Sequence, residues 1–245
     1  MARQARFCSP GRAHLVRLQA ASSASPLATP AQRDRFRQWM AQGLSLASVR
    51  LHGYAVLPDS ALLLLTPRTA ADLSRYVQGL ARRSSRARTP ASFASTGDSP
   101  QIGPAWAGRF QSALVQPGDW ELAAMMWIDC AAERAGLSTG LSNAVAWPWS
   151  SRAAHCGEVS PTSAPPLVLT DPEAYWRLGN TPFARESVYR ERLAQGLSPQ
   201  QMHALEAALR SGRAAGDAAF VRQLEFESGR RLLPVPRGRP RTKVA

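Results

Sequence analysis

Residues 48–66 read SVRLHGYAVLPDSALLLLT and predict two strands joined by a tight turn. The first half is rich in β-branched, aromatic and aliphatic residues, which favour strands. Pro58, Asp59 and Ser60 supply turn chemistry, because proline fixes φ and the two polar side chains bond their own backbone. Residues 61–65 are a continuous apolar run, which is typical of a strand buried on both faces. We therefore expect this hairpin in the middle of a sheet.

The elements around the hairpin are expected in the order strand, helix, strand, strand, helix, strand. A short alternating strand begins at His14, and a helix with a capping box begins at Thr29 and is predicted to end at Gly43. Thr69 begins a second helix after the hairpin, and residues 106–115 alternate as a further strand. This order is typical of an α+β fold with a ferredoxin-like antiparallel sheet (βαββαβ).

The rest of the chain is predicted to be helical. A long helix is expected over residues 120–135, where Gly136 ends it. From about residue 166, short helices begin at Ser, Thr or Asp followed by proline. They form either an appendage of the helix-turn-helix kind or a helical cap on the sheet. We expect three parts: a sheet domain over 1–155, a helical region over 166–230 and a basic tail over 231–245.

The charge of the chain predicts a polyanionic partner. The formal net charge is +13, and all of the 30 basic residues except Lys243 are arginines. A compositional bias would explain arginine in place of lysine, but it would not explain why there are only 17 acidic residues. Arginine suits bidentate phosphate contacts, so we favour nucleic acid as the partner.

The three cysteines are widely spaced, so neither a zinc site nor a disulfide framework is predicted. The sequence has no apolar signal region and no membrane-length apolar run. We expect a cytoplasmic protein without a membrane segment.

Two arginine clusters are candidate DNA contacts. The end of the second predicted helix carries Arg82, Arg83, Arg86 and Arg88, which form either a phosphate-binding patch or a solvated face that complements the helix C-terminus. The segment Arg237-Gly238-Arg239-Pro240 resembles the core of an AT-hook, a motif that reads a narrow minor groove. The alternative is a disordered basic tail that binds phosphates without specificity.

Several segments resemble the REP-associated tyrosine transposases, a branch of the single-tyrosine HUH transposases. Residues 54–64, YAVLPDSALLL, fit without a gap the family frame Tyr-Val-Leu-Met-Pro-Asn-His-Val-His-Leu-Leu. Residues 106–110, WAGRF, keep the family pattern Trp-x-Gly-Arg-Phe, and residues 146–151, AWPWSS, resemble its Tyr-Pro-Trp-Ser-Ser block. The resemblance covers about residues 1–155. It implies the HUH fold, single-stranded DNA as substrate, and Mg²⁺ or Mn²⁺ as cofactor.

The family's catalytic residues are absent from the matching positions. The resemblance implies two metal-binding histidines and a nucleophilic tyrosine, but those positions hold Ser60, Leu62 and Trp127. A further polar ligand is replaced by Ala131. A leucine cannot bind a hard cation, and one serine hydroxyl is a poor substitute for histidine. We therefore expect no catalytic residue, no bound metal and no cofactor, and we expect Leu62 and Trp127 to meet in a small hydrophobic core.

Gly108 and Arg109 belong to the kept pattern, and we predict that they contact DNA; a bulge glycine with a surface arginine is the alternative.

The predicted function is that of a transposase-family protein that binds DNA, as single-stranded hairpins, and no longer cuts it. A homodimer is compatible with this function. The alternative is an active DNA transposase that forms a 5′-phosphotyrosine intermediate through non-standard residues, using one of four other tyrosines, with Asp59 or Asp129 as a cation ligand. An RNA-binding module ranks last, because the strands lack the aromatic spacing that such a sheet needs.

Overall fold

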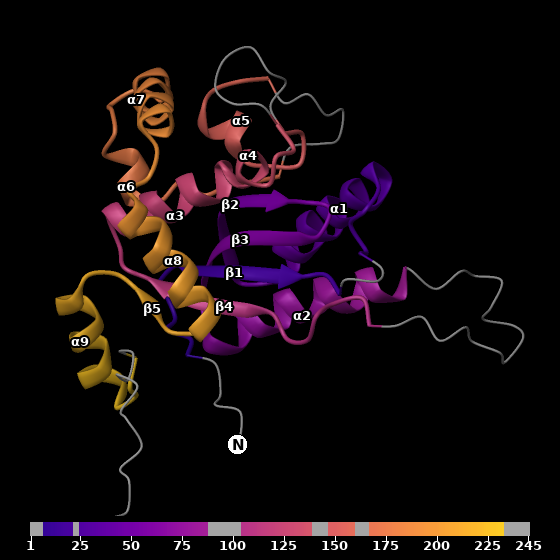
Figure 1. Cartoon of the computed structure of the whole chain (residues 1–245), viewed down its shortest axis with the longest axis horizontal. Helices are drawn as coiled ribbons and strands as arrows, with labels where there is room; N and C mark the ends of the chain where they lie inside the picture. Colours follow the sequence, from indigo (N-terminus) through magenta and orange to yellow (C-terminus); the bar gives the residue numbers. More distant parts are fainter. Residues whose placement is uncertain (1–6, 22–24, 88–103, 139–146, 160–166, 233–245) are drawn as a thin grey trace, which may run out of the picture.

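The computed structural model describes residues 7–21, 25–87, 104–138, 147–159 and 167–232. Its centre is one five-stranded sheet in the order β2-β3-β1-β4-β5 (Figure 1). The pairs β2–β3, β3–β1 and β1–β4 are antiparallel, and β5 runs parallel to β4. The strands are β1 (His14–Gln19), β2 (Val49–Val56), β3 (Ser60–Pro67), β4 (Gln111–Val115) and β5 (Ala214–Ala215).

The expected α+β fold is confirmed. Helix α1 (Pro30–Leu46) joins β1 to β2, helix α2 (Ala70–Arg86) joins β3 to β4, and the strand order β4-β1-β3-β2 is that of a ferredoxin-like sheet. The sheet is mixed rather than wholly antiparallel, because the short β5 comes from the C-terminal region and pairs in parallel with β4.

Helix α1 begins with the predicted capping box at Thr29, but it runs past Gly43 to Leu46. A Cβ atom at Gly43 would lie 2.8 Å from the ring of Tyr76 on α2. This glycine therefore allows α1 and α2 to pack closely and does not end the helix.

The hairpin of β2 and β3 is not in the middle of the sheet, because β2 is the edge strand. It is buried nevertheless, since residues 149–151 run along its free edge. Val56 N–H donates to the Trp149 carbonyl at 2.8 Å, and Ser151 N–H donates to the Tyr54 carbonyl at 2.9 Å. A sequence distant along the chain thus covers the edge that would otherwise be open to pairing.

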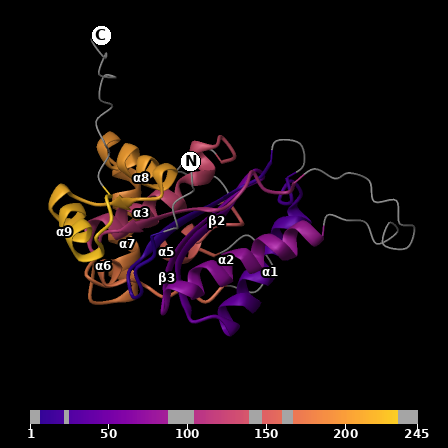
Figure 2. The same ribbon diagram turned by 90° about the horizontal axis from the view of Figure 1, so that it is seen from below.

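The two faces of the sheet are buried by different helices, as Figure 2 shows. On one face, Ala61, Leu63 and Leu65 of β3 pack with α1 and α2. On the other face, Leu62 and Leu64 pack with α3 (Asp119–Asp129) and the C-terminal helices. This alternation places residues i and i+2 of β3 on one side, as the period of a strand requires.

The single helix predicted over residues 120–135 is in fact two. It is interrupted at Cys130, where φ is −89° and ψ is 9°, so α3 ends at Asp129 and a short α4 follows.

The predicted C-terminal helices are present, and α8 packs on β4 and β1 as a helical cap on the sheet. In the described part of the chain, no helix is both long and apolar enough to cross a bilayer. The remaining helices are α4 (Ala131–Arg134), α5 (Arg152–His155), α6 (Glu173–Trp176), α7 (Pro182–Gln195), α8 (Pro199–Ser211) and α9 (Ala218–Ser228).

Candidate nucleic-acid interface

The segment Trp106–Phe110 presents an arginine at the rim of the sheet. Trp106 and Phe110 are buried, and the Trp106 indole N–H donates to the Ala81 carbonyl of α2 at 3.2 Å. Between these two anchors the chain turns outward at Gly108, whose φ of 101° favours glycine. Arg109 is consequently exposed. The segment is a turn and not part of the predicted strand, because β4 begins only at Gln111.

Arg109 lines a groove of about 480 Å³ beside β4. Its walls come from four parts of the chain: Phe7 near the N-terminus, the turn before β4 with the start of that strand, the end of α8 with the link to β5, and the residues that follow α9. The groove contains five arginines, which are Arg109, Arg210, Arg213, Arg230 and Arg231.

The electrostatics of this arginine groove favour an anionic ligand. No aspartate or glutamate is among the described residues that line it. One carboxylate touches its wall, since Glu225 accepts a hydrogen bond from Leu232 N–H at 2.5 Å. In the described ranges, no ion pair is formed by Arg109, Arg210 or Arg213. Several uncompensated guanidinium groups around one hollow are a suitable site for phosphates.

The arginines predicted from the sequence lie in different places. Arg82, Arg83 and Arg86 are exposed on the last turns of α2, where Arg83 donates to the Gln42 side chain at 3.2 Å, and none of the three lines the groove. Arg88, Arg237 and Arg239 lie outside the described residues.

The groove arginines at the end of α8 and in the residues that follow α8 and α9 were not singled out from the sequence. Their signal is a pair of short arginine- and glycine-containing runs that follow predicted helices, Arg210-Ser-Gly-Arg213 and Gly229-Arg-Arg231. Neither run indicates by itself that it meets Arg109.

The positions that match the family's catalytic residues lie inside the protein. Ser60 and Leu62 are on the α3 side of β3, and Ser60 Oγ donates to Asp59 Oδ1 at 2.9 Å. Leu62 is 3% exposed and Trp127 is 5% exposed, and both belong to the same hydrophobic cluster. Ala131 is part of that cluster as well.

Two guanidinium groups occupy the surroundings of Leu62 and Trp127. Arg17 is the cross-strand partner of Leu62, and it binds the Glu206 carboxylate through two contacts of 3.0 and 3.3 Å. The Arg134 guanidinium lies over the Trp127 ring, 4.6 Å from its centre, and burial lowers the pKa of this arginine. The contacts are those of a packed ion pair and a cation–π stack.

These residues do not fit a Mg²⁺ or Mn²⁺ ion. Both ions prefer carboxylate, carbonyl and water oxygens, and Mn²⁺ also accepts imidazole, whereas the side chains here offer one serine hydroxyl beside an arginine. Within the described residues, no group of three or more His, Cys, Asp or Glu side chains is placed to hold a metal.

Asp129, at the end of α3, is the centre of a buried polar network. Its Oδ1 accepts from Ser151 Oγ at 2.6 Å, and its Oδ2 accepts from the Tyr189 hydroxyl at 2.7 Å and from His155 Nδ1 at 2.6 Å. Gly53 makes room for this arrangement, because a Cβ atom there would lie 3.3 Å from Ser151 Oγ. The network ties α3, α5 and α7 to the edge strand β2, and its three donors occupy the oxygens that a cation would need.

His155 is held as an imidazolium. Its Nδ1 faces the Asp129 carboxylate, and its Nε2 faces the His52 carbonyl at 2.9 Å, so both nitrogens meet acceptors. Burial by itself would lower the pKa of His155, but the Asp129 carboxylate, the Asp171 charge and the His52 carbonyl together raise it more, and the net shift is upward. The result is a buried ion pair between His155 and Asp129.

All four tyrosines of the chain are buried, with exposed fractions of 4% or less. The hydroxyls of Tyr76, Tyr175 and Tyr189 donate to the Met40 carbonyl, the His155 carbonyl and the Asp129 carboxylate. Burial raises the pKa of Tyr54, which disfavours its phenolate. None of the four hydroxyls is therefore presented to a phosphate at the surface.

Comparison with solved structures identifies the fold. The chain resembles the structure of a REP-associated tyrosine transposase bound to a REP hairpin, with a TM-score of 0.52, 15% identity, and coverage of 71% of this chain and 96% of that one. A weaker match is a crystal structure with a provisional transposase assignment from Deinococcus radiodurans R1, with a TM-score of 0.32, 19% identity, and coverage of 47% and 87%. No protein-family model matches the sequence, and neither does any curated protein. The chain thus has a transposase-like fold.

Proposed function

We propose that this chain is a member of the REP-associated tyrosine transposase family that binds hairpin-forming single-stranded DNA and does not cut it. The observation that carries this proposal is the arginine groove beside β4. The structural relative with the same fold was solved with a REP hairpin bound, which supports DNA as the ligand here.

The groove is suited to a DNA backbone rather than to a small anion. It is about 480 Å³ in volume and open, with arginines on walls that come from distant parts of the chain. Phe7 and Phe110 also line it, and Arg230 lies 5.8 Å from the Phe7 ring. Basic side chains mixed with aromatic ones are typical of surfaces that follow a single strand.

The absence of cleavage follows from the chemistry of the matching positions. Cutting by this family's mechanism needs a metal to polarise the scissile phosphate and a tyrosine to attack it. Ser60, Leu62 and Trp127 supply neither, and Leu62 and Trp127 are packed in the core. The four tyrosines elsewhere are buried. Binding and cleavage are therefore separated in this protein.

One incubation tests the proposal. The full chain is mixed with an end-labelled single-stranded hairpin oligonucleotide and Mn²⁺, and the sample is divided between a native and a denaturing gel. We expect a shifted band on the native gel and an intact, unlinked strand on the denaturing gel. A cleaved or protein-linked strand would show an active transposase that uses non-standard residues, and no shift at all would refute DNA binding.

Variants locate the binding surface. The triple variant Arg109→Gln, Arg210→Gln, Arg213→Gln should weaken hairpin binding at least tenfold, and it should reduce the slope of log K against log salt by about 0.7 for each phosphate that the variant no longer neutralises. Arg222→Gln is the matched control, because Arg222 is an exposed arginine of α9 that does not line the groove. If the triple variant and the control lose the same hairpin affinity for each charge removed, the groove is not the DNA-binding surface.

A further inference from the structure

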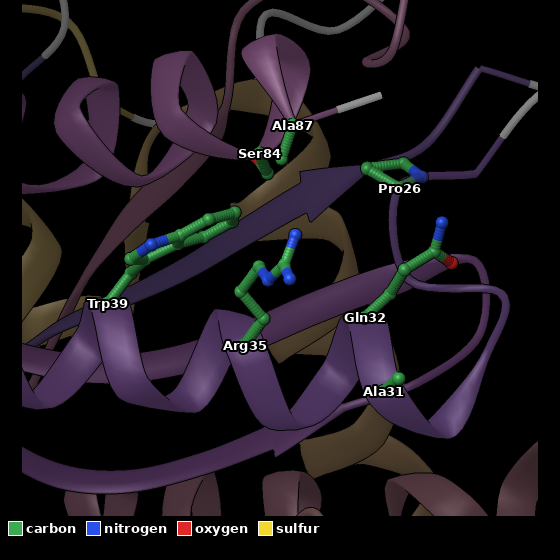
Figure 3. Close-up of a pocket in the computed structure, with 7 residues that line it drawn as sticks. All are labelled: Pro26, Ala31, Gln32, Arg35, Trp39, Ser84 and Ala87. Atoms are coloured by element: carbon green, nitrogen blue, oxygen red, sulfur yellow. The ribbon is translucent and has the colours of Figure 1, made fainter. Parts of the chain in front are cut away.

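A second cavity lies between α1 and the end of α2 (Figure 3). These two helices cover the face of the sheet opposite to that of Leu62. It has a volume of about 130 Å³. Trp39 and Arg35 of α1 line it, Ser84 and Ala87 of α2 lie across from them, and Pro26 closes one end. In Figure 3 the Arg35 guanidinium extends from α1 into the space between the Trp39 ring and the Gln32 side chain.

The cavity combines an aromatic wall with a free guanidinium. Trp39 is partly buried and packs against the core beneath α1, so its ring is held in place. Ser84 Oγ donates to the Leu80 carbonyl at 2.7 Å and needs no partner from a ligand. In the described part of the chain, Arg35 forms no hydrogen bond or ion pair. Its donors are directed into the cavity without an acceptor to receive them.

The second polar group is oriented by the helix cap. Gln32 Oε1 accepts from Thr29 N–H at 2.9 Å, which fixes the side chain and leaves its amide nitrogen as a donor. Ala31, Ser84 and Ala87 are small, which leaves space between the two helices. A flat apolar slot with two donors, one of them fixed by the helix cap, matches the usual composition of a small-ligand site.

The surroundings of the cavity are basic. Arg86 lies between Ser84 and Ala87 in the last turn of α2 and is exposed, and Arg82 and Arg83 are exposed one turn earlier. A ligand that places a flat ring in the slot can therefore place a phosphate beside these arginines. Nucleotides have both parts, and single-stranded DNA is bound elsewhere by stacking bases on aromatic rings next to a basic track.

We propose that this cavity holds one unpaired guanine base of the bound DNA, stacked on Trp39. Guanine presents two acceptors, O6 and N7, on one edge, and an arginine fork matches them with two N–H groups. Arg35 provides that fork, and the arginines of α2 contact the phosphate of the same nucleotide. The inference rests on the proposed DNA binding for its biological ligand, but the slot can be tested without DNA.

The first test uses deoxyguanosine monophosphate as the probe and the full chain labelled with nitrogen-15. The indole N–H signal of Trp39 is assigned by its loss in Trp39→Phe. We expect this signal to shift on titration with the probe, and we expect the affinity to fall about tenfold in Arg35→Gln and with 7-deaza-deoxyguanosine monophosphate, which lacks the N7 acceptor. No shift of Trp39, or equal binding of the two nucleotides, would overturn the proposal.

The second test uses an oligothymidine with one central guanine. Replacement of that guanine by an abasic site should weaken binding about tenfold in the wild type and should have no effect in Trp39→Leu. Trp176→Leu is the matched control, because Trp176 is a half-exposed tryptophan on the other face of the sheet. If neither oligonucleotide binds but the nucleotide shifts Trp39, the proposed DNA binding fails and the guanine slot stands. If both bind equally, the slot fails and DNA binding stands.

Discussion

The region around Leu62 and Trp127 and the arginine groove beside β4 have opposite chemistry. The first is closed: both side chains are buried, and the guanidinium groups of Arg17 and Arg134 are occupied by Glu206 and by the Trp127 ring. The groove is open, and Arg109, Arg210 and Arg213 have no ion pair in the described part of the chain. A fold of this kind can thus hold core packing around Leu62 and Trp127 while its rim keeps charges that suit an anionic ligand.

The largest expected effect is on the closed region. Asp129→Ala should lower the free energy of unfolding by about 3–5 kcal/mol, because it removes the partner of a buried charged histidine and leaves the Tyr189 hydroxyl without an acceptor. Urea denaturation of the variant and the wild type measures this difference. Hairpin affinity at a temperature where the variant is folded should change less than twofold, since the groove is formed by other residues.

The control for this prediction is Asp59→Ala. Asp59 is exposed in the β2–β3 turn, and its carboxylate accepts from Ser60 at 2.9 Å and from Gln19 at 3.5 Å. Its removal should cost about 1 kcal/mol or less. Equal costs at the two positions would mean that the Asp129 network does not hold the closed region together.

Features of the fold that depend on neighbouring residues could be predicted from the sequence. The β2–β3 turn, the capping box at Thr29 and the helix start at Thr69 are present, because each is decided by a few consecutive side chains. The edge position of β2 could not be predicted in this way. Its apolar sequence indicates burial, but the cover is supplied by residues 149–151, about a hundred positions away.

The second prediction concerns two buried neutral histidines. Burial lowers the pKa of His14 and of His52 from 6.5 to about 4. Each ring has one nitrogen against a carbonyl, of Arg12 or Thr170, and its other nitrogen accepts from Ser9 N–H or the Thr66 hydroxyl. Because the pKa of each histidine is lower in the folded state than in the unfolded state, each neutral ring contributes stability that is complete above pH 6.5. This contribution is lost as the pH falls toward 4, where the histidines gain a proton. The loss is about 3 kcal/mol for each histidine.

The measurement is the free energy of unfolding against pH for the wild type and His52→Gln. The variant should be less stable at pH 7, but it should lose about 3 kcal/mol less than the wild type between pH 6.5 and 4. His203→Gln is the control, because His203 is exposed on α8. The ion pair of His155 with Asp129 makes stability depend on pH in the opposite direction. Because the pKa of His155 is raised in the folded state, its contribution is lost as the pH rises through that folded pKa. Parallel profiles of wild type and His52→Gln would contradict the assignment.

The candidate site was only partly predictable, for the same reason that limits the fold. Arg109 could be singled out because the pattern around it is local, with two buried aromatic anchors and a glycine that turns the chain outward. The arginines at 210, 213, 230 and 231 meet it only through the packing of α8 and α9 beside β4. Asp129 has the chemistry of a cation ligand, but its three donors come from α5, α7 and the residue before α5, whose position no local pattern reveals.

The smallest expected effect comes from introducing one histidine in the closed region. Leu62→His should lower the free energy of unfolding by about 2 kcal/mol, because it places an imidazole without a partner in an apolar cluster next to the Arg17 guanidinium. Leu62→Met, which keeps the volume and the apolar character, should cost less than about 1.5 kcal/mol. Mn²⁺ should not recover the loss, since neighbouring Ser60 and Arg17 offer no second strong ligand. A rise in the melting temperature of Leu62→His with added Mn²⁺, absent in Leu62→Met, would show that a histidine at position 62 can bind a metal. The chemistry of the two regions would then differ less than their packing indicates.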